Sequence, residues 1–236
     1  MGQVESVSFP GEQHWLHCLS TPLIALFHPD KNRGTEAMDR MGVLPVYEGK
    51  LIHDHWKPYF KYMSCIHSLC NAHHLRELER AFEQEGQHWA KLMQKLLLQI
   101  KTATDLAGGC LSKKAANKFR KKYRRLLRIA NNECPLNVKS KAQSKSRNLL
   151  ERLINFEDET LRFMEDFDVP FTNNAAENDQ RMTKVQQKIS GCFRTMEGAK
   201  IFCRIRSYLV TCRKNGVSWT EALNLLFEGK LPAFMT

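Results

Sequence analysis

The chain has 236 residues, of which 42% are hydrophobic and 26% charged, enough for one large domain or two small ones with a substantial core. Its longest apolar run, Leu23 to Phe27, is far shorter than the roughly 20 residues that cross a bilayer, and no signal-peptide pattern opens the chain. Eight irregularly spaced cysteines do not resemble a secreted disulfide scaffold. We therefore expect a globular protein of the reducing cytosol, without a membrane span.

The net charge of +11 is concentrated in one segment. Residues 111–150 contain thirteen Lys or Arg side chains and a single acid, Glu133, whereas the rest of the chain is close to neutral. A basic block of this density predicts a polyanionic partner, with nucleic acid as the first candidate. The alternative is a solvated helix followed by a flexible basic loop.

The first fifty-five residues predict a mixed sheet covered by helices. Turn signals at Pro10-Gly11 and Thr21-Pro22 separate short runs that are rich in apolar and β-forming residues. The predicted elements are three strands in a meander, a short helix and a further strand, at Val4–Phe9, His14–Ser20, Leu23–His28, Thr35–Met41 and Lys50–His53.

Beyond residue 70 the apolar spacing becomes helical. Asn173 or Asn174 is expected to cap one of these helices, and Ser218 with Glu221 forms a capping box for the last one. The polar segment 131–147 contains Pro135 and predicts a loop. Helices are predicted at about 75–100, 112–129, 149–167, 175–189, 199–212 and from 218 onward.

Two carboxylates occupy positions suited to metal binding. Asp54 follows the strand that ends at His53, and Glu177 lies in the first turn of a predicted helix. Two Mg²⁺ ions held by carboxylates can activate an attacking oxygen and stabilise a leaving one in phosphoryl transfer. The alternative is that Asp54 only ends a strand and Glu177 only favours a helix N-terminus.

Basic side chains follow Glu177 along the same helix face. Arg181, Lys184 and Lys188 lie four, seven and eleven residues further on, where they could bind phosphate. A solvated surface face would have the same pattern.

A third cluster consists of Cys65, His67, Cys70, His73 and His74. The spacing of Cys70 and His73 is compatible with zinc, and Cys65 could add a third ligand. A structural zinc site needs a second regularly spaced pair, which is not evident. The alternative is that Cys70 and His73 are packed, hydrogen-bonded groups near the core.

At these same residues the sequence resembles the transposases of the insertion-sequence-66 family. The resemblance extends over nearly the whole chain in one order. It rests on the segments His14–His17, Gly42–Pro45, His53–Tyr59, Leu69–Leu78, Asn173–Glu177, Lys184–Lys188 and Gly191–Arg194.

The resemblance implies a ribonuclease-H-like α/β fold, with a mixed sheet, a large helical insertion and a helical C-terminus. Its segments would be 1–70, with the sheet and the second acid, 71–168, the basic helical insertion, and 169–236, which completes the core. It also implies three acids that bind Mg²⁺ (or Mn²⁺) and cut and join DNA. Asp54 matches the second acid and Glu177 the third, and Cys70 with His73 would support the site.

The implied partners are DNA, as element ends and target, and further copies of the chain on that DNA, in the bacterial cytoplasm. The cations expected to contact DNA are Lys121, Lys122, Arg124, Arg125, Arg181, Lys184 and Lys188.

The resemblance fails at the first acid. The family's Asp-Glu-Thr segment would lie about eleven residues before His14, and that position holds Gln3. Glu5 is two residues away and would keep the strand face. We therefore expect an incomplete or decayed transposase with little activity. The alternatives are a non-catalytic DNA-binding module, or a small zinc-stabilised interaction domain built around Cys65, Cys70 and His73.

Overall fold

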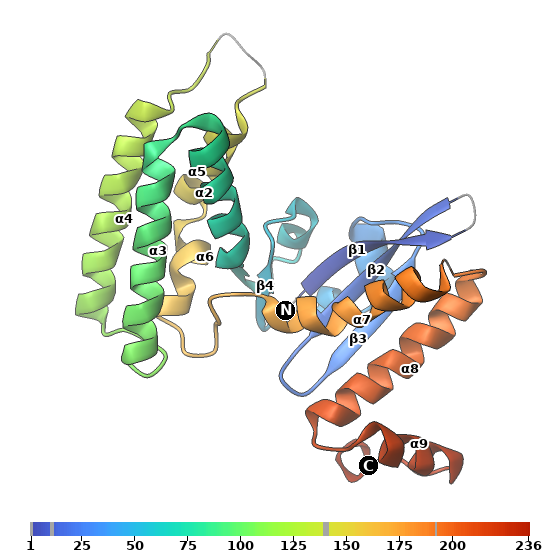
Figure 1. The fold of residues 1–236 in the computed structure, drawn as a ribbon. Helices are drawn as coiled ribbons and strands as arrows, with labels where there is room; N and C mark the ends of the chain where they lie inside the picture. The colour runs from blue at the N-terminus through green and yellow to red at the C-terminus, as the bar shows by residue number, and fades with distance from the viewer. Residues whose placement is uncertain (1, 10–11, 139–141, 192) are drawn as a thin grey trace. The chain divides into compact units, whose positions relative to one another are not determined.

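The computed structural model describes residues 2–9, 12–138, 142–191 and 193–236 (Figure 1). The side chains of residues 3–9, 12, 184, 186–188 and 190 lie outside this description. The chain divides into two compact units. We call Met1–Ile66 with Asn173–Thr236 the sheet unit and His67–Thr172 the helical unit.

The sheet unit is built on an antiparallel meander of three strands. The strands are β1 (Gly2–Phe9), β2 (Glu12–Ser20) and β3 (Ala25–Asp30), in the order β1-β2-β3. The third strand begins two residues later than predicted. The reason is a turn in which Thr21 N–H donates to the Ile24 carbonyl at 2.7 Å.

After β3 the chain forms the helix α1 (Thr35–Met41), which ends at Gly42 with a φ of 77°. The strand β4 (Lys50–His53) follows the 3-10 helix η1 (Leu44–Val46) and lies beside β1. The next 3-10 helix is η2 (Lys57–Lys61). The strand β5 (Ile66–Leu69) was not predicted, and its Ile66 N–H donates to the Gly49 carbonyl at 3.0 Å.

One face of the meander is covered by helices from the far end of the sequence (Figure 1). These are α7 (Asn174–Ser190) and α8 (Met196–Lys214). The helix α9 (Trp219–Phe227) and the 3-10 helix η4 (Ala233–Met235) follow them in the chain. The shared core contains Leu16, Cys18, Phe27, Ala176, Cys203 and Val210.

The open edge of β3 is closed by α8. Ser207 and Thr211 accept the backbone N–H groups of Phe27 and Ala25 at 2.9 and 3.1 Å. An edge strand with free N–H groups would otherwise invite pairing with another chain.

The helical unit is a ring of four helices. These are α2 (Asn71–Glu85), α3 (His88–Leu106), α4 (Lys113–Glu133) and α5 (Lys145–Asn155), each packed against two of the others. The helix α6 (Glu157–Leu161) and the 3-10 helix η3 (Arg162–Met164) complete it. Its fully buried side chains include Trp89, Met93, Leu97, Tyr123, Leu149 and Leu153.

Three predictions for this unit were wrong in their limits. The helix expected at about 75–100 is two helices, because α2 ends at Gly86, which has a φ of 66°, and α3 begins at His88. The loop expected at 131–147 is shorter, because α4 continues to Glu133 and Ser144 caps α5 by accepting the Arg147 N–H at 3.0 Å. The helix expected at 149–167 is interrupted at Phe156, which ends α5 and precedes α6.

Candidate functional site

Asp54 lies in a tight turn at the end of β4. Its Oδ1 accepts the N–H of Trp56 at 3.1 Å, and the buried His53 accepts the N–H of His55 at 3.2 Å. His55 has a φ of 69° and is the one non-glycine described with a positive φ. Such backbone conformations cost of order 1–3 kcal/mol and often occur at functional sites. The turn therefore fixes the direction of the Asp54 carboxylate, which is partly exposed.

Tyr59 connects this turn to the start of β1. Its fully buried ring packs on His53 and Trp56, with ring centroids 4.8 and 5.6 Å apart. Burial raises the pKa of Tyr59 well above its usual value, and the negative charge of Asp54 raises it further. A Cβ on Gly2 would come within 3.1 Å of this ring, so β1 begins against Tyr59.

The start of α7 is attached to the same end of β1. Asn173 is buried, and its Nδ2 donates to the Gly2 carbonyl at 2.9 Å. Asn173 is the N-cap residue of α7, as predicted, but its side chain forms no capping hydrogen bond and its amide binds β1 instead. Glu177 follows in the first turn of α7 and is partly buried.

A buried ion pair also fixes α7. Asp179 Oδ2 lies 2.8 Å from Lys214 Nζ on α8 and accepts a hydrogen bond from Ser20 at 2.7 Å. The next residue, Gln180, donates its side-chain amide to the Leu16 carbonyl at 3.1 Å. None of these side chains was predicted to be important, because their partners lie far away in the chain.

The Asp54 turn and the first turn of α7 thus both adjoin the start of β1. A shared metal site between Asp54 and Glu177 remains a prediction. Gln3 is the next residue of β1 and pairs in register with Cys18 on β2, while Glu5 pairs with Leu16. The side chains of Gln3 and Glu5 lie outside the description, so the expectation that Glu5 does not replace the first acid also remains a prediction.

The three residues of the proposed zinc cluster differ in their surroundings. Cys65, in the sheet unit, donates its thiol to the Tyr47 carbonyl at 3.3 Å, and burial raises its pKa. A protonated, hydrogen-bonded thiol is a poor metal ligand. Cys70 is the buried N-cap residue of α2 in the helical unit, and His73 lies in the first turn of that helix. Their supporting role remains a prediction.

The cations of the basic helix α4 differ in their exposure and in their partners. Lys121, Lys122 and Arg125 are exposed. Arg124 forms an ion pair with Glu157 at 2.9 Å, and Arg120, 14% exposed, is bonded to three carboxylates, those of Glu157, Asp158 and Glu165.

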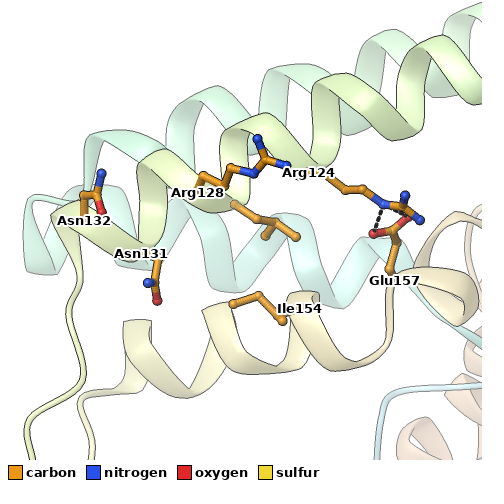
Figure 2. Close-up of a pocket in the computed structure, with 7 residues that line it drawn as sticks. Arg124, Arg128, Asn131, Asn132, Ile154 and Glu157 are labelled. Carbon is orange, nitrogen blue, oxygen red and sulfur yellow. Dashed lines mark hydrogen bonds and ion pairs between the residues drawn. The ribbon is translucent and has the colours of Figure 1, made fainter.

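A groove of about 530 Å³ runs between α4 and α5. Figure 2 shows Arg124 turned toward Glu157, with Arg128, Asn131 and Ile154 along the groove. Outside this unit, Arg181 is exposed on α7, and the side chains of Lys184 and Lys188 lie outside the description.

The fold defines an α/β protein in which a helical unit is inserted between two segments of a sheet unit. Residues 5–201 match the model of a protein family described as "Transposase IS66 family". Because the match covers most of the chain, the protein belongs to the IS66 family of transposases. No curated protein and no solved structure matches it. Among the helices described, none has the length and apolar character needed to span a bilayer.

Proposed function

We propose that this protein is the catalytic part of a transposase that cuts and joins DNA by metal-assisted phosphoryl transfer. The supporting observation is the meeting of three elements at one end of β1. Tyr59 of the Asp54 segment packs on Gly2, and Asn173 at the start of α7 binds its carbonyl. Residues distant in the sequence are thereby held around one strand end.

The order of elements supports a ribonuclease-H-like core. A three-stranded antiparallel meander is followed by α1 and by β4, which lies beside the first strand. The helical unit is inserted between β4 and α7. This arrangement allows acids from β1, from the end of β4 and from α7 to serve one site.

Mg²⁺ or Mn²⁺ suits the donors of this proposed site. Both cations prefer oxygen ligands, which Asp54 and Glu177 supply. No described residue other than Trp56 forms a hydrogen bond with the Asp54 carboxylate, so Oδ2 is available as a ligand. When bound, such ions stabilise the charge on the attacking and leaving oxygens. The turn at His55 and the hydrogen bond from Trp56 would hold Asp54 in place.

The residue at the position of the first acid limits the proposed cleavage activity. Gln3 offers a neutral amide oxygen, which brings no charge to offset a divalent ion, so metal affinity is expected to be low. This substitution also favours a second candidate, a non-catalytic DNA-binding module. The exposed Lys121, Lys122 and Arg125 of α4 would contact phosphates in either case, on a homo-oligomer assembled at the DNA ends.

The test is strand cleavage on DNA that carries the element's ends, in Mn²⁺, with the full chain. We expect Gln3→Asp to cleave at least tenfold faster than the unmodified protein. Adding Asp54→Ala to that variant should abolish the gain, whereas adding Asp105→Ala, at an exposed acid of α3, should not. Strong cleavage by the unmodified chain would contradict the limit set by Gln3. Tight binding without cleavage by any variant would favour the DNA-binding module.

A further inference from the structure

One arginine of the sheet unit lies over the rings of two tryptophans that are distant in the sequence. The guanidinium carbon of Arg33 lies 4.9 Å from the centroid of the Trp15 ring and 4.7 Å from that of Trp56. Trp15 belongs to β2, Trp56 follows the Asp54 turn, and Arg33 lies between β3 and α1. An arginine stacked on two rings has a fixed plane, which leaves only its edge for hydrogen bonding.

The edge of Arg33 has no partner in the described part of the chain. Arg33 is exposed, and no hydrogen bond or ion pair is formed by its guanidinium. Arg40 of α1 behaves differently, because it binds Asp30 through two hydrogen bonds of 2.7 and 2.9 Å. Arg33 therefore presents five N–H donors in a fixed plane, without a carboxylate to receive them.

The stack is directly connected to the Asp54 turn. The residue whose ring carries Arg33, Trp56, is also the residue whose N–H binds Asp54 Oδ1 at 3.1 Å. A ligand bound by Arg33 would thus lie close to the proposed catalytic acid. A planar guanidinium edge matches two oxygens of a phosphate or carboxylate. In a protein that acts on DNA, the matching group is a backbone phosphodiester.

We propose that Arg33, held between Trp15 and Trp56, binds a phosphodiester of the DNA strand beside the Asp54 turn. This inference rests on the proposed function, because it takes DNA as the ligand. It assigns Arg33 the task of positioning that strand, which bidentate arginines perform in other phosphoryl-transfer sites. The two indole rings supply the rigidity that makes the contact directional.

The test observes the tryptophans directly and needs no cleavage. The full chain is labelled with 5-fluorotryptophan, and its four ¹⁹F signals are assigned with single Trp→Phe variants. Hexathymidylate is then added in EDTA. We expect saturable shifts of the Trp15 and Trp56 signals. The signal of Trp89, buried in the helical unit, serves as a reference for the fold.

Substitution separates a phosphate contact from simple stacking. Arg33→Lys keeps the charge but loses the planar edge, and should weaken binding reported by these signals about tenfold. Arg213→Ala is the matched control, because Arg213 lies 5.5 Å from the Trp219 ring and should not affect that affinity. A hexathymidylate with a neutral methylphosphonate backbone should not shift Trp15 or Trp56.

Three outcomes would overturn the inference. They are equal affinity in Arg33→Lys, equal shifts with the neutral oligonucleotide, and unmoved Trp15 and Trp56 signals in the unmodified chain. Because the titration is free of metal, a failure of the proposed catalysis does not affect it. If the chain cleaves DNA through Asp54 and yet shows one of these outcomes, the proposed function stands and only the role of Arg33 is wrong.

Discussion

Buried charged side chains of the sheet unit have fixed partners, whereas many charges on α4 of the helical unit face solvent. In the sheet unit Asp179 is 8% exposed and pairs with Lys214, and Asp30 binds Arg40 through two hydrogen bonds. On α4, Lys121, Lys122 and Arg125 are exposed. The comparison indicates that buried charge serves structure in the sheet unit, whereas the exposed cations of α4 are available for a partner. Arg33 departs from this pattern within the sheet unit.

The largest effect on stability is expected at the buried ion pair. Asp179→Asn should lower the free energy of unfolding by about 3 kcal/mol, because it leaves Lys214 charged and only 13% exposed without its counter-ion. The measurement is urea unfolding at pH 7. The control is Asp105→Ala, which removes an exposed pair with Lys101 and should cost about 0.5 kcal/mol or less. Similar losses in both variants would contradict the comparison.

A smaller effect on the free energy of unfolding is expected when a change of pH protonates Asp30. Burial alone would raise the pKa of Asp30, but hydrogen bonds from Arg40 and the Asn32 backbone lower it to about 2. Because the folded pKa is below the unfolded one, the stabilisation is complete above about pH 4 and is lost as the pH falls toward about 2. Its size is about 2 kcal/mol.

Arg40→Gln should remove part of that stabilisation at pH 7 and flatten the stability curve between about pH 4 and pH 2. Urea unfolding over this range measures both effects. Lys61→Gln is the control, since Lys61 and its partner Asp39 are both exposed. Parallel pH curves for Arg40→Gln and the unmodified protein would show that Asp30 does not depend on this contact.

The smallest effect on stability, and the clearest on binding, is expected on α4. Replacing Lys121, Lys122 and Arg125 with Gln should change the free energy of unfolding by less than about 0.5 kcal/mol. For every DNA phosphate that the variant no longer neutralises, the slope of log K against log salt should fall by about 0.9. Arg124→Gln alone should leave the slope unchanged, because Glu157 already pairs with Arg124. An equal decrease of slope in Arg124→Gln would mean that DNA displaces Glu157.

Local patterns predicted most of the elements, because the signals for strands and helices lie within a few neighbouring residues. The helix Thr35–Met41 and the strand Lys50–His53 have the predicted bounds. Ser218 accepts the Glu221 N–H at 3.2 Å, as the capping box requires. The strand Ile66–Leu69 was not predicted, because the polar His67 and Ser68 at its centre interrupt any run of β-forming residues.

The candidate site could be predicted only in part. Asp54 and Glu177 were identified by their places at a strand end and a helix start, but long-range contacts were not visible. Asn173 could be expected to cap a helix, and only the fold shows that it binds Gly2. The thirteen basic residues counted in 111–150 include Arg120 as if it were available to a partner. In the structure Arg120 binds acids that lie 37 to 45 residues further along the chain.

The insertion of the helical unit has a consequence for how the chain folds during synthesis. Gly2 and Asn173 must meet across 171 positions, so β1 cannot complete its contacts until α7 has left the ribosome. At about 5–20 residues per second, the intervening segment takes roughly 10–30 s to make. The helical unit, rich in local contacts, can form during this interval. During this interval the apolar face of the meander stays uncovered. At that stage a nascent chain would depend most on a chaperone.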